Sequence, residues 1–198
     1  MPNSKYRRIA DSAAKSVAEE KLKVSFEYID WETEEFFFHG MEIKYYEKVF
    51  NCIHTISECR ERDILEQTHP SLSPKSVFNS SSGSKDAFPD SVISKIKDKL
   101  YVQTRDEDAA KDQAIEISSR AFEVRVSKNH GRIHGFVWNN TFYIVWFDPA
   151  HNLYPMKRGI TKHKDAAQVR CFSPEEVIRL QQIIKGLQNE IEELYEAL

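Results

Sequence analysis

One stretch of sequence decides the fold of this chain: Arg132-Ile-His-Gly-Phe-Val-Trp138, then Asn139-Asn140, then Thr141-Phe-Tyr-Ile-Val-Trp-Phe-Asp148. Runs rich in β-branched and aromatic residues flank the two asparagines, as is typical of paired strands. Asparagine tolerates the positive φ that both central residues of a type I′ turn adopt. The sequence therefore predicts an antiparallel hairpin with strands at 132–138 and 141–148.

A two-residue turn also predicts which residues lie opposite one another. Phe136 is expected opposite Tyr143, His134 opposite Val145, and Arg132 opposite Phe147. Side chains alternate between the two faces of a strand. One face is then almost wholly apolar, and we assign it to the core: Ile133, Val137, Phe142, Ile144 and Trp146.

The opposite face of the hairpin mixes basic, aromatic and hydroxyl side chains. It carries Arg132, His134, Phe136, Trp138, Thr141, Tyr143, Val145 and Phe147. Two interpretations stand at this point. Either the face is open and binds a ligand, as one face of an antiparallel sheet often does, or a second layer covers it and its rings belong to the core.

Periodicity along the rest of the chain predicts further elements. Three prolines and a serine-rich stretch predict a mobile loop across 68–89. Alternation indicates strands at 24–30, 36–38 and 122–126, whereas helical spacing or composition indicates helices at 9–22, 42–62, 90–103 and 106–120.

The expected fold class is α+β, with an antiparallel sheet around the central hairpin, flanking helices and a C-terminal coiled-coil-like helix. We expect three parts: an N-terminal helical arm at 1–23, an α+β domain at 24–170 and the C-terminal helix at 173–198.

The C-terminal segment has the signals of a capped amphipathic helix. Ser173 is a natural N-cap, Pro174 suits the first helical position, and Glu176 completes a capping box. Apolar residues recur at heptad spacing and form a seam, with Val177, Ile184, Ile191 and Leu198 at a positions and Leu180, Leu187 and Leu194 at d positions. In a parallel pair this choice favours two strands. The seam is expected to dock on its own domain, on a second copy of the chain or on a different partner.

Composition and charge limit the classes of function. The chain has 198 residues, a net charge of −3 and 12 % aromatic residues, which suits a folded domain. A near-neutral balance gives no global attraction to nucleic acid or membrane. We expect a cytoplasmic protein without a membrane partner, because there is no run of about 18 apolar residues and no apolar leader. The three cysteines form no Cys-x-x-Cys pair and are expected to be reduced.

Candidate catalytic residues gather where the second hairpin strand ends. Asp148, His151 and Tyr154 lie around a proline, which stops strand pairing. His151 is a candidate general base, and Asp148 can orient an imidazole. The alternative is that Asp148 caps its own turn. Two residues of the hairpin complete the expected catalytic set: Arg132 and His134.

A basic segment follows this loop. Residues 157–170 carry a net charge of +4, from five basic residues and one acidic residue. Lysine and arginine contact phosphates, and aromatic side chains stack on bases. The candidate nucleic-acid contacts are Lys128, Trp138, Tyr143, Lys157, Arg158, Lys162 and Lys164. The alternative is a solvated loop.

Several enzyme classes lack their motifs in this chain. There is no Gly-x-Ser-x-Gly, no Gly-x-x-x-x-Gly-Lys and no Gly-x-Gly-x-x-Gly, which argues against a serine hydrolase and against a nucleotide fold. The seven histidines are scattered, and we expect neither a metal nor a cofactor. Pro89-Asp90 with Glu123-Val-Arg125 only faintly echoes the Pro-Asp…Glu-x-Lys pattern of metal-dependent nucleases.

The order of elements around the hairpin resembles the core of RelE/ParE-type toxins. A helix leads into Phe122–Val126, then Gly131–Phe136, then Phe142–Phe147 and a polar tail, and the resemblance covers about residues 115–158. In that superfamily, a small α+β domain presents basic and aromatic side chains to RNA or blocks a protein target. The resemblance implies metal-free RNA cleavage, with candidate residues Lys128, Arg132, His134, His151, Tyr154 and Arg158.

Two hypotheses of function follow. The first is a small cytosolic protein that acts on nucleic acid as a metal-independent RNA-cleaving toxin or phage-defence effector, with RNA and an antitoxin or other protein as partners. The second is a non-catalytic interaction protein. It would form a homodimer through residues 173–198, or bind a partner through that helix and the aromatic sheet face.

Overall fold

The hairpin forms with the predicted strand bounds, β4 at Arg132–Trp138 and β5 at Thr141–Asp148. The computed structural model describes residues 20–78, 83–154 and 174–196. In the turn, Asn139 and Asn140 have φ angles of 49° and 52°. Both angles lie in the left-handed region that a type I′ turn requires, so the prediction for this hairpin turn is confirmed.

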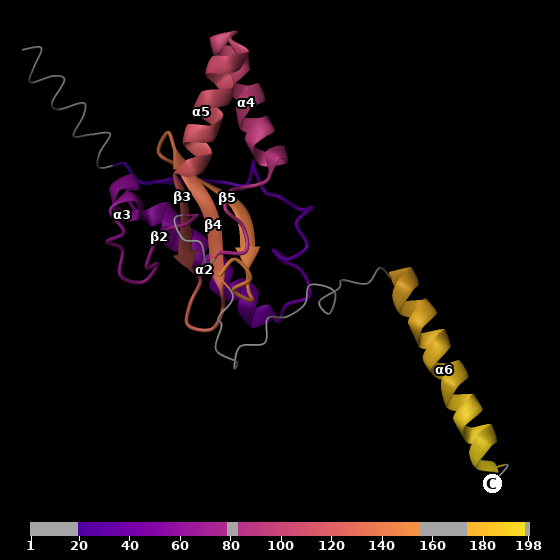
Figure 1. Ribbon diagram of the computed structural model, residues 1–198. Helices are drawn as coiled ribbons and strands as arrows, with labels where there is room; N and C mark the ends of the chain where they lie inside the picture. Colours follow the sequence, from indigo (N-terminus) through magenta and orange to yellow (C-terminus); the bar gives the residue numbers. More distant parts are fainter. Residues whose placement is uncertain (1–19, 79–82, 155–173, 197–198) are drawn as a thin grey trace, which may run out of the picture.

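The hairpin is the centre of a five-stranded sheet with the order β1-β5-β4-β3-β2 (Figure 1). β3 (Ala121–Arg125) pairs antiparallel with β4, and β2 (Lys75–Ser76) pairs antiparallel with β3. β1 (Lys23–Ser25) instead pairs parallel with β5. The α+β class is confirmed, but the sheet is mixed rather than antiparallel throughout. The parallel pair forms because the chain returns from β1 through helices rather than through a tight turn.

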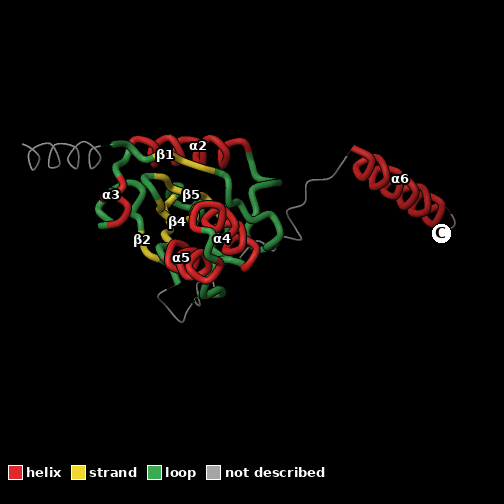
Figure 2. Tube along the Cα trace, turned by 90° about the horizontal axis from the view of Figure 1, so that it is seen from above, coloured by secondary structure: helices red, strands yellow, loops and turns green. Residues whose placement is uncertain are grey.

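Helices cover both faces of this sheet. α2 (Ile43–Glu58) and α3 (Glu61–Leu65) pack on one face, and α4 (Asp90–Thr104) and α5 (Glu107–Ser119) pack on the other. Figure 2 shows α2 on one side of the strands and α4 with α5 on the opposite side. The mixed face of the hairpin is therefore covered, and the interpretation of an open binding face is wrong.

A β-bulge that the sequence did not predict interrupts the hairpin. Gly135 of β4 lies opposite Ile144, but the preceding residue, His134, lies opposite Trp146. Val145 is therefore an extra residue on β5, which is the definition of a bulge. The predicted opposition of His134 and Val145 is wrong for this reason.

The bulge exchanges the faces of the residues beyond it. Arg132 lies opposite Asp148 rather than opposite Phe147 as predicted. Trp146, expected on the apolar face, packs in the core under α4 and α5, whereas Phe147 packs in the core under α2. The shift also brings Asp148 onto the face of His134 and Trp146, so that the His134 ring hydrogen-bonds to Asp148 beside the indole.

The segment before α2 does not form the predicted strand at 36–38. Its aromatic side chains instead pack against residues of β5. Phe36 stacks on Trp146 with ring centroids 4.2 Å apart, and Phe38 lies 4.5 Å from Phe147. Asp30 accepts a hydrogen bond of 2.7 Å from the Trp146 indole. These contacts hold the segment against both cores. The strand expected at 24–30 is accordingly short and ends at Ser25.

Two other expectations have different outcomes. The expected loop at 68–89 contains ordered structure, and the expected N-terminal helix lies mostly outside the described residues. The segment 68–89 contains β2, and its Leu72, Val77 and Phe88 side chains are buried. Most of the expected N-terminal helix, up to residue 19, lies outside the described residues.

Gly135 is the residue that permits the bulge. A Cβ atom at this position would lie 2.1 Å from the Tyr143 carbonyl oxygen and 2.9 Å from the Phe142 ring. No real Cβ atom approaches a backbone oxygen this closely, so any larger residue must displace β5.

The substitution Gly135→Ala is expected to lower the free energy of unfolding by about 2–3 kcal/mol, because overpacking forces backbone shifts. Urea unfolding followed by tryptophan fluorescence measures this change. Gly186→Ala is the matched control, because a Cβ there meets nothing within 4 Å. The control should leave the transition of the domain unchanged. A Gly135→Ala variant within about 0.5 kcal/mol of the wild type would contradict the assignment.

Candidate functional site

Five polar side chains gather at the end of the sheet where β4 begins and β5 ends. We call them the polar cluster: Glu123, Arg132, His134, Asp148 and His151. The Arg132 Nε atom lies 3.2 Å from the Glu123 carboxylate, and both side chains are largely buried. The strand register places Glu123 opposite His134 and Arg132 opposite Asp148, and His151 follows Asp148 in the next turn. The cluster thus unites four of the five predicted catalytic residues.

The centre of the polar cluster is a buried pair between His134 and Asp148. The His134 Nε2 atom lies 3.3 Å from the Asp148 carboxylate. Asp148 also accepts backbone N–H bonds of 2.7 Å from Asn152 and 3.0 Å from Leu153. The interpretation of Asp148 as a turn cap is therefore confirmed. Asp148 also contacts an imidazole, that of His134.

The hydrogen bonds keep Asp148 ionised. Burial alone would raise the pKa of this carboxyl. The hydrogen bond and the electrostatic attraction of His134, with the two backbone donors, outweigh burial and hold the pKa below its ordinary value. A charged carboxylate in the core is thus stable only while its partners stay in place.

His134 lies inside an aromatic layer and is closed to solvent. Its exposed fraction is 0 %. Its ring faces Phe36 at 6.1 Å and Trp146 at 6.4 Å. The Nδ1 atom has no hydrogen-bond partner among the described residues. The geometry therefore supports a structural role, in which His134 and Asp148 fasten the turn at 149–153 to the sheet.

His151 is a member of the polar cluster whose titratable ring solvent can reach. It is half-buried, and its φ of 60° is in the left-handed region. Burial lowers the pKa of His151, and the positive charge of Arg132 lowers it further. The neutral ring that results is the form of imidazole that accepts a proton.

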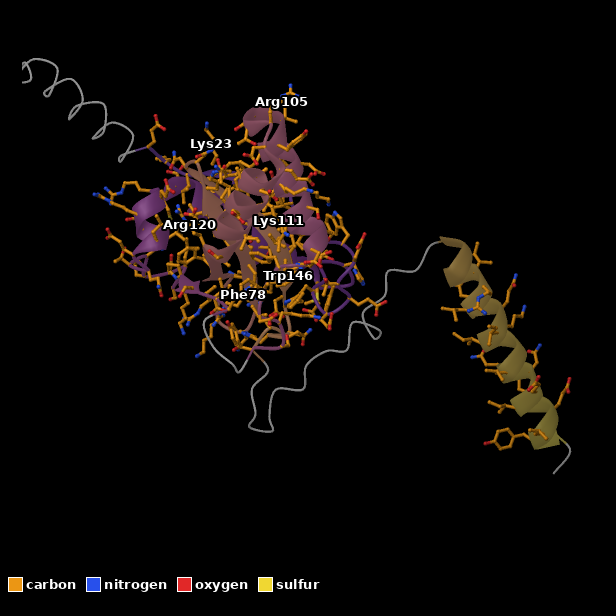
Figure 3. The ribbon with its side chains drawn as sticks, turned by 45° about the horizontal axis from the view of Figure 1, so that its top comes forward. Lys23, Phe78, Arg105, Lys111, Arg120 and Trp146 are labelled. Carbon is orange, nitrogen blue, oxygen red and sulfur yellow. The ribbon has the colours of Figure 1, made fainter. Side chains whose placement is uncertain are left out.

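Tyr154, the fifth predicted catalytic residue, serves elsewhere in the fold. Its hydroxyl accepts a hydrogen bond of 3.0 Å from the backbone N–H of Phe78. Ser84 donates a backbone bond of 2.8 Å to the carbonyl of Leu153 beside it. Tyr154 therefore ties the chain after β5 to the segment before α4. Phe78, labelled in Figure 3, also packs 6.3 Å from the Trp146 ring.

The predicted nucleic-acid contacts are not brought together. Lys128 is exposed in the turn between β3 and β4. Trp138 and Tyr143 lie at the other end of the hairpin, with ring centroids 6.1 Å apart, and Tyr143 stacks on Phe136 inside the core. The other four contacts lie outside the described residues: Lys157, Arg158, Lys162 and Lys164.

Sequence reasoning missed a pocket of about 190 Å³ at the end of the sheet where β5 ends. The start of α2, the turn between β3 and β4, and the end of β5 line it with Met41, Glu42, Lys44, Tyr45, Asn129, His130 and Pro149. Residues far apart in sequence form this pocket, so no local sequence pattern predicts it. Within the described ranges, no group of three or more His, Cys, Asp or Glu side chains is placed to hold a metal.

Sequence reasoning also missed Glu123 as the partner of Arg132. The available signal was an acidic residue, Glu123, in a largely apolar strand, followed by a basic residue, Arg132, at the start of the next strand. The register puts Glu123 opposite His134 and diagonal to Arg132.

A second candidate site is the seam of α6 (Pro174–Glu196), the yellow helix of Figure 1. The predicted C-terminal helix is confirmed. Residues 178–195 are exposed, except Leu180, which is half-buried. Ile184, Leu187 and Ile191 are 55, 53 and 52 % exposed, and Leu194 is 66 % exposed. A continuous apolar stripe in water is a feature of interaction surfaces.

No family model, curated protein or solved structure matches this chain. None of the described helices combines the length and the apolar character needed to cross a bilayer.

Asp148→Asn is expected to lower the free energy of unfolding by about 3 kcal/mol near neutral pH, because the variant leaves a buried pair broken. The pKa of Asp148 is lower in the folded than in the unfolded chain. Its contribution is therefore complete above about pH 4 and is lost as the pH falls through the folded value. Urea unfolding of both proteins at neutral and acidic pH measures the difference.

The control for this experiment is Asp98→Asn, which changes an exposed carboxylate on α4. It should cost little at any pH. A difference between wild type and Asp148→Asn that stays constant on acidification would show that Asp148 does not stabilise the fold as an ion.

Proposed function

We propose that this chain is a non-catalytic interaction protein that self-associates through the seam of α6. The single observation that carries the proposal is the exposed seam, with Ile184, Leu187, Ile191 and Leu194 each more than half exposed. The covered sheet supports it too, because among the described residues helices pack on both faces of the sheet, including the aromatic face of the hairpin.

The exposed seam of α6 leaves its main source of stability unused. In proteins, most helical stability comes from packing of an apolar face. Gly186 weakens α6 further, by about 1 kcal/mol relative to alanine. A helix of this kind forms stably when its seam is buried against another helix.

The area available in the seam suits a reversible interaction. Burying a Leu or Ile side chain contributes about 1.5–3 kcal/mol when complete, and pairing covers the exposed half of each. Eight such side chains in a pair of helices contribute on the order of 10 kcal/mol. Association costs a similar amount, about 4–15 kcal/mol, so the assembly should depend on protein concentration.

A second candidate function, binding of nucleic acid, is supported by one sequence observation. Residues 157–164 hold four basic side chains, and Lys128 is exposed in the turn between β3 and β4. Together with the resemblance to RelE/ParE-type toxins, this supports contacts to RNA phosphates. The half-buried, neutral His151 is then the candidate base for RNA cleavage.

The nucleic-acid function makes its own prediction. Incubation of the protein with total RNA in chelator is expected to give cleavage that His151→Ala removes. Replacement of Lys157, Arg158, Lys162 and Lys164 by alanine should weaken RNA binding and its salt dependence, because phosphate contacts release counterions. Intact RNA together with salt-independent or absent binding would contradict this function.

The self-association function predicts that Leu187→Lys converts the assembly to monomers. A charge at this central d position cannot be buried in a seam between two helices. Light scattering across a range of protein concentrations measures the molar mass, and circular dichroism measures the loss of helix.

Gln182→Lys is the matched control, because it places the same charge on the outer face of α6. It should keep the mass of the wild type. A wild-type protein that stays monomeric over the whole concentration range would contradict self-association, whatever its helix content.

A further inference from the structure

The two halves of α6 differ in charge. Residues 174–186 hold two acidic residues, Glu175 and Glu176, and two basic residues, Arg179 and Lys185, for a net charge of 0. Residues 187–196 hold four acidic residues and no basic residue, for a net charge of −4: Glu190, Glu192, Glu193 and Glu196. The last turn contains no basic residue. The negative end of the helix dipole and the acidic residues therefore coincide.

We propose that α6 pairs with a second copy of this chain in the antiparallel orientation. This inference rests on the proposed self-association and adds the direction of the partner. Each acidic half then lies beside the neutral half of the partner, and each negative helix end lies beside a positive one. The two acidic halves are thereby kept apart, which reduces the repulsion between them.

A parallel pair brings the acidic halves together. The two acidic halves would lie side by side, with a charge of −4 on each, and both negative helix ends would coincide. The positions that flank the seam would also gain no ion pair. Ile183 would face the partner's Gln188, and Glu190 would face the partner's Tyr195. Nothing at these positions favours the parallel orientation.

The seam itself fits the antiparallel orientation. In this orientation an a residue of one helix packs beside a d residue of the other. Ile184 meets the partner's Leu187, and Leu180 meets the partner's Ile191. The seam residues from 180 to 191 are therefore used, in layers that each combine a β-branched residue with a leucine.

The orientation has a consequence for the whole molecule. With a rise of about 1.5 Å per residue, the two points where the α+β domains join the helices lie about 35 Å apart along the axis. A parallel pair would instead place the starts of both helices at the same end.

Distances between spin labels on the full chain test this inference. The labels are placed in Cys171→Ser protein at Lys185→Cys, near the centre of the pair, or at Glu193→Cys, in the acidic half. Burial raises the pKa of Cys52 to about 12 and that of Cys59 to about 11, and both side chains are buried, so neither competes for the label.

The antiparallel pair predicts a short distance for the Lys185→Cys label and a distance longer by about 20 Å along the axis for the Glu193→Cys label. Two equally short distances would overturn the antiparallel orientation and leave self-association intact. Absence of any coupling at Lys185→Cys, at concentrations where the unlabelled protein is examined by light scattering, would overturn both.

Discussion

The bulge at Val145, opposite Gly135, is the constraint on which the rest of the domain depends. It turns Trp146 toward the layer under α4 and α5, where Asp30 and Phe36 hold the indole. It also brings Asp148 onto the face of His134, and their pair fastens the chain that leaves the sheet. One extra residue in one strand thus decides how both connecting segments attach to the domain.

The buried polar cluster shows why residues of catalytic type need not form an active site. His134 and Asp148 lie under aromatic rings, and Glu123 holds Arg132 in an ion pair. These contacts hold parts of the fold together: the His134–Asp148 pair fastens the turn after β5, and Glu123 joins β3 to β4 through Arg132. In the described structure the seam of α6 exposes a continuous row of apolar side chains to water, whereas Trp31, Ile43 and Phe50 are exposed residues of the α+β domain.

Local sequence patterns predicted those elements whose formation depends on neighbouring residues in the chain. The Asn139-Asn140 turn, the strands that it joins and the apolar stripes of α2 and α4 follow from the neighbouring residues alone. The bulge did not follow, because the sequence 142–147 alternates equally well with or without an extra residue. The parallel strand β1 and the His134–Asp148 pair depend on long-range register, which no local pattern carries. The capping role of Asp148 was predictable, because its proline neighbour and its turn lie beside it in the chain.

Hydrogen exchange of the full chain at several protein concentrations tests the central claim most directly. If α6 is stabilised by a second copy, the protection of its backbone amides rises with concentration, while that of the β4 and β5 amides stays constant. Protection of α6 that is already complete at the lowest concentration, and does not change on further concentration, would contradict the account, because it would place the partner of the seam within the same chain.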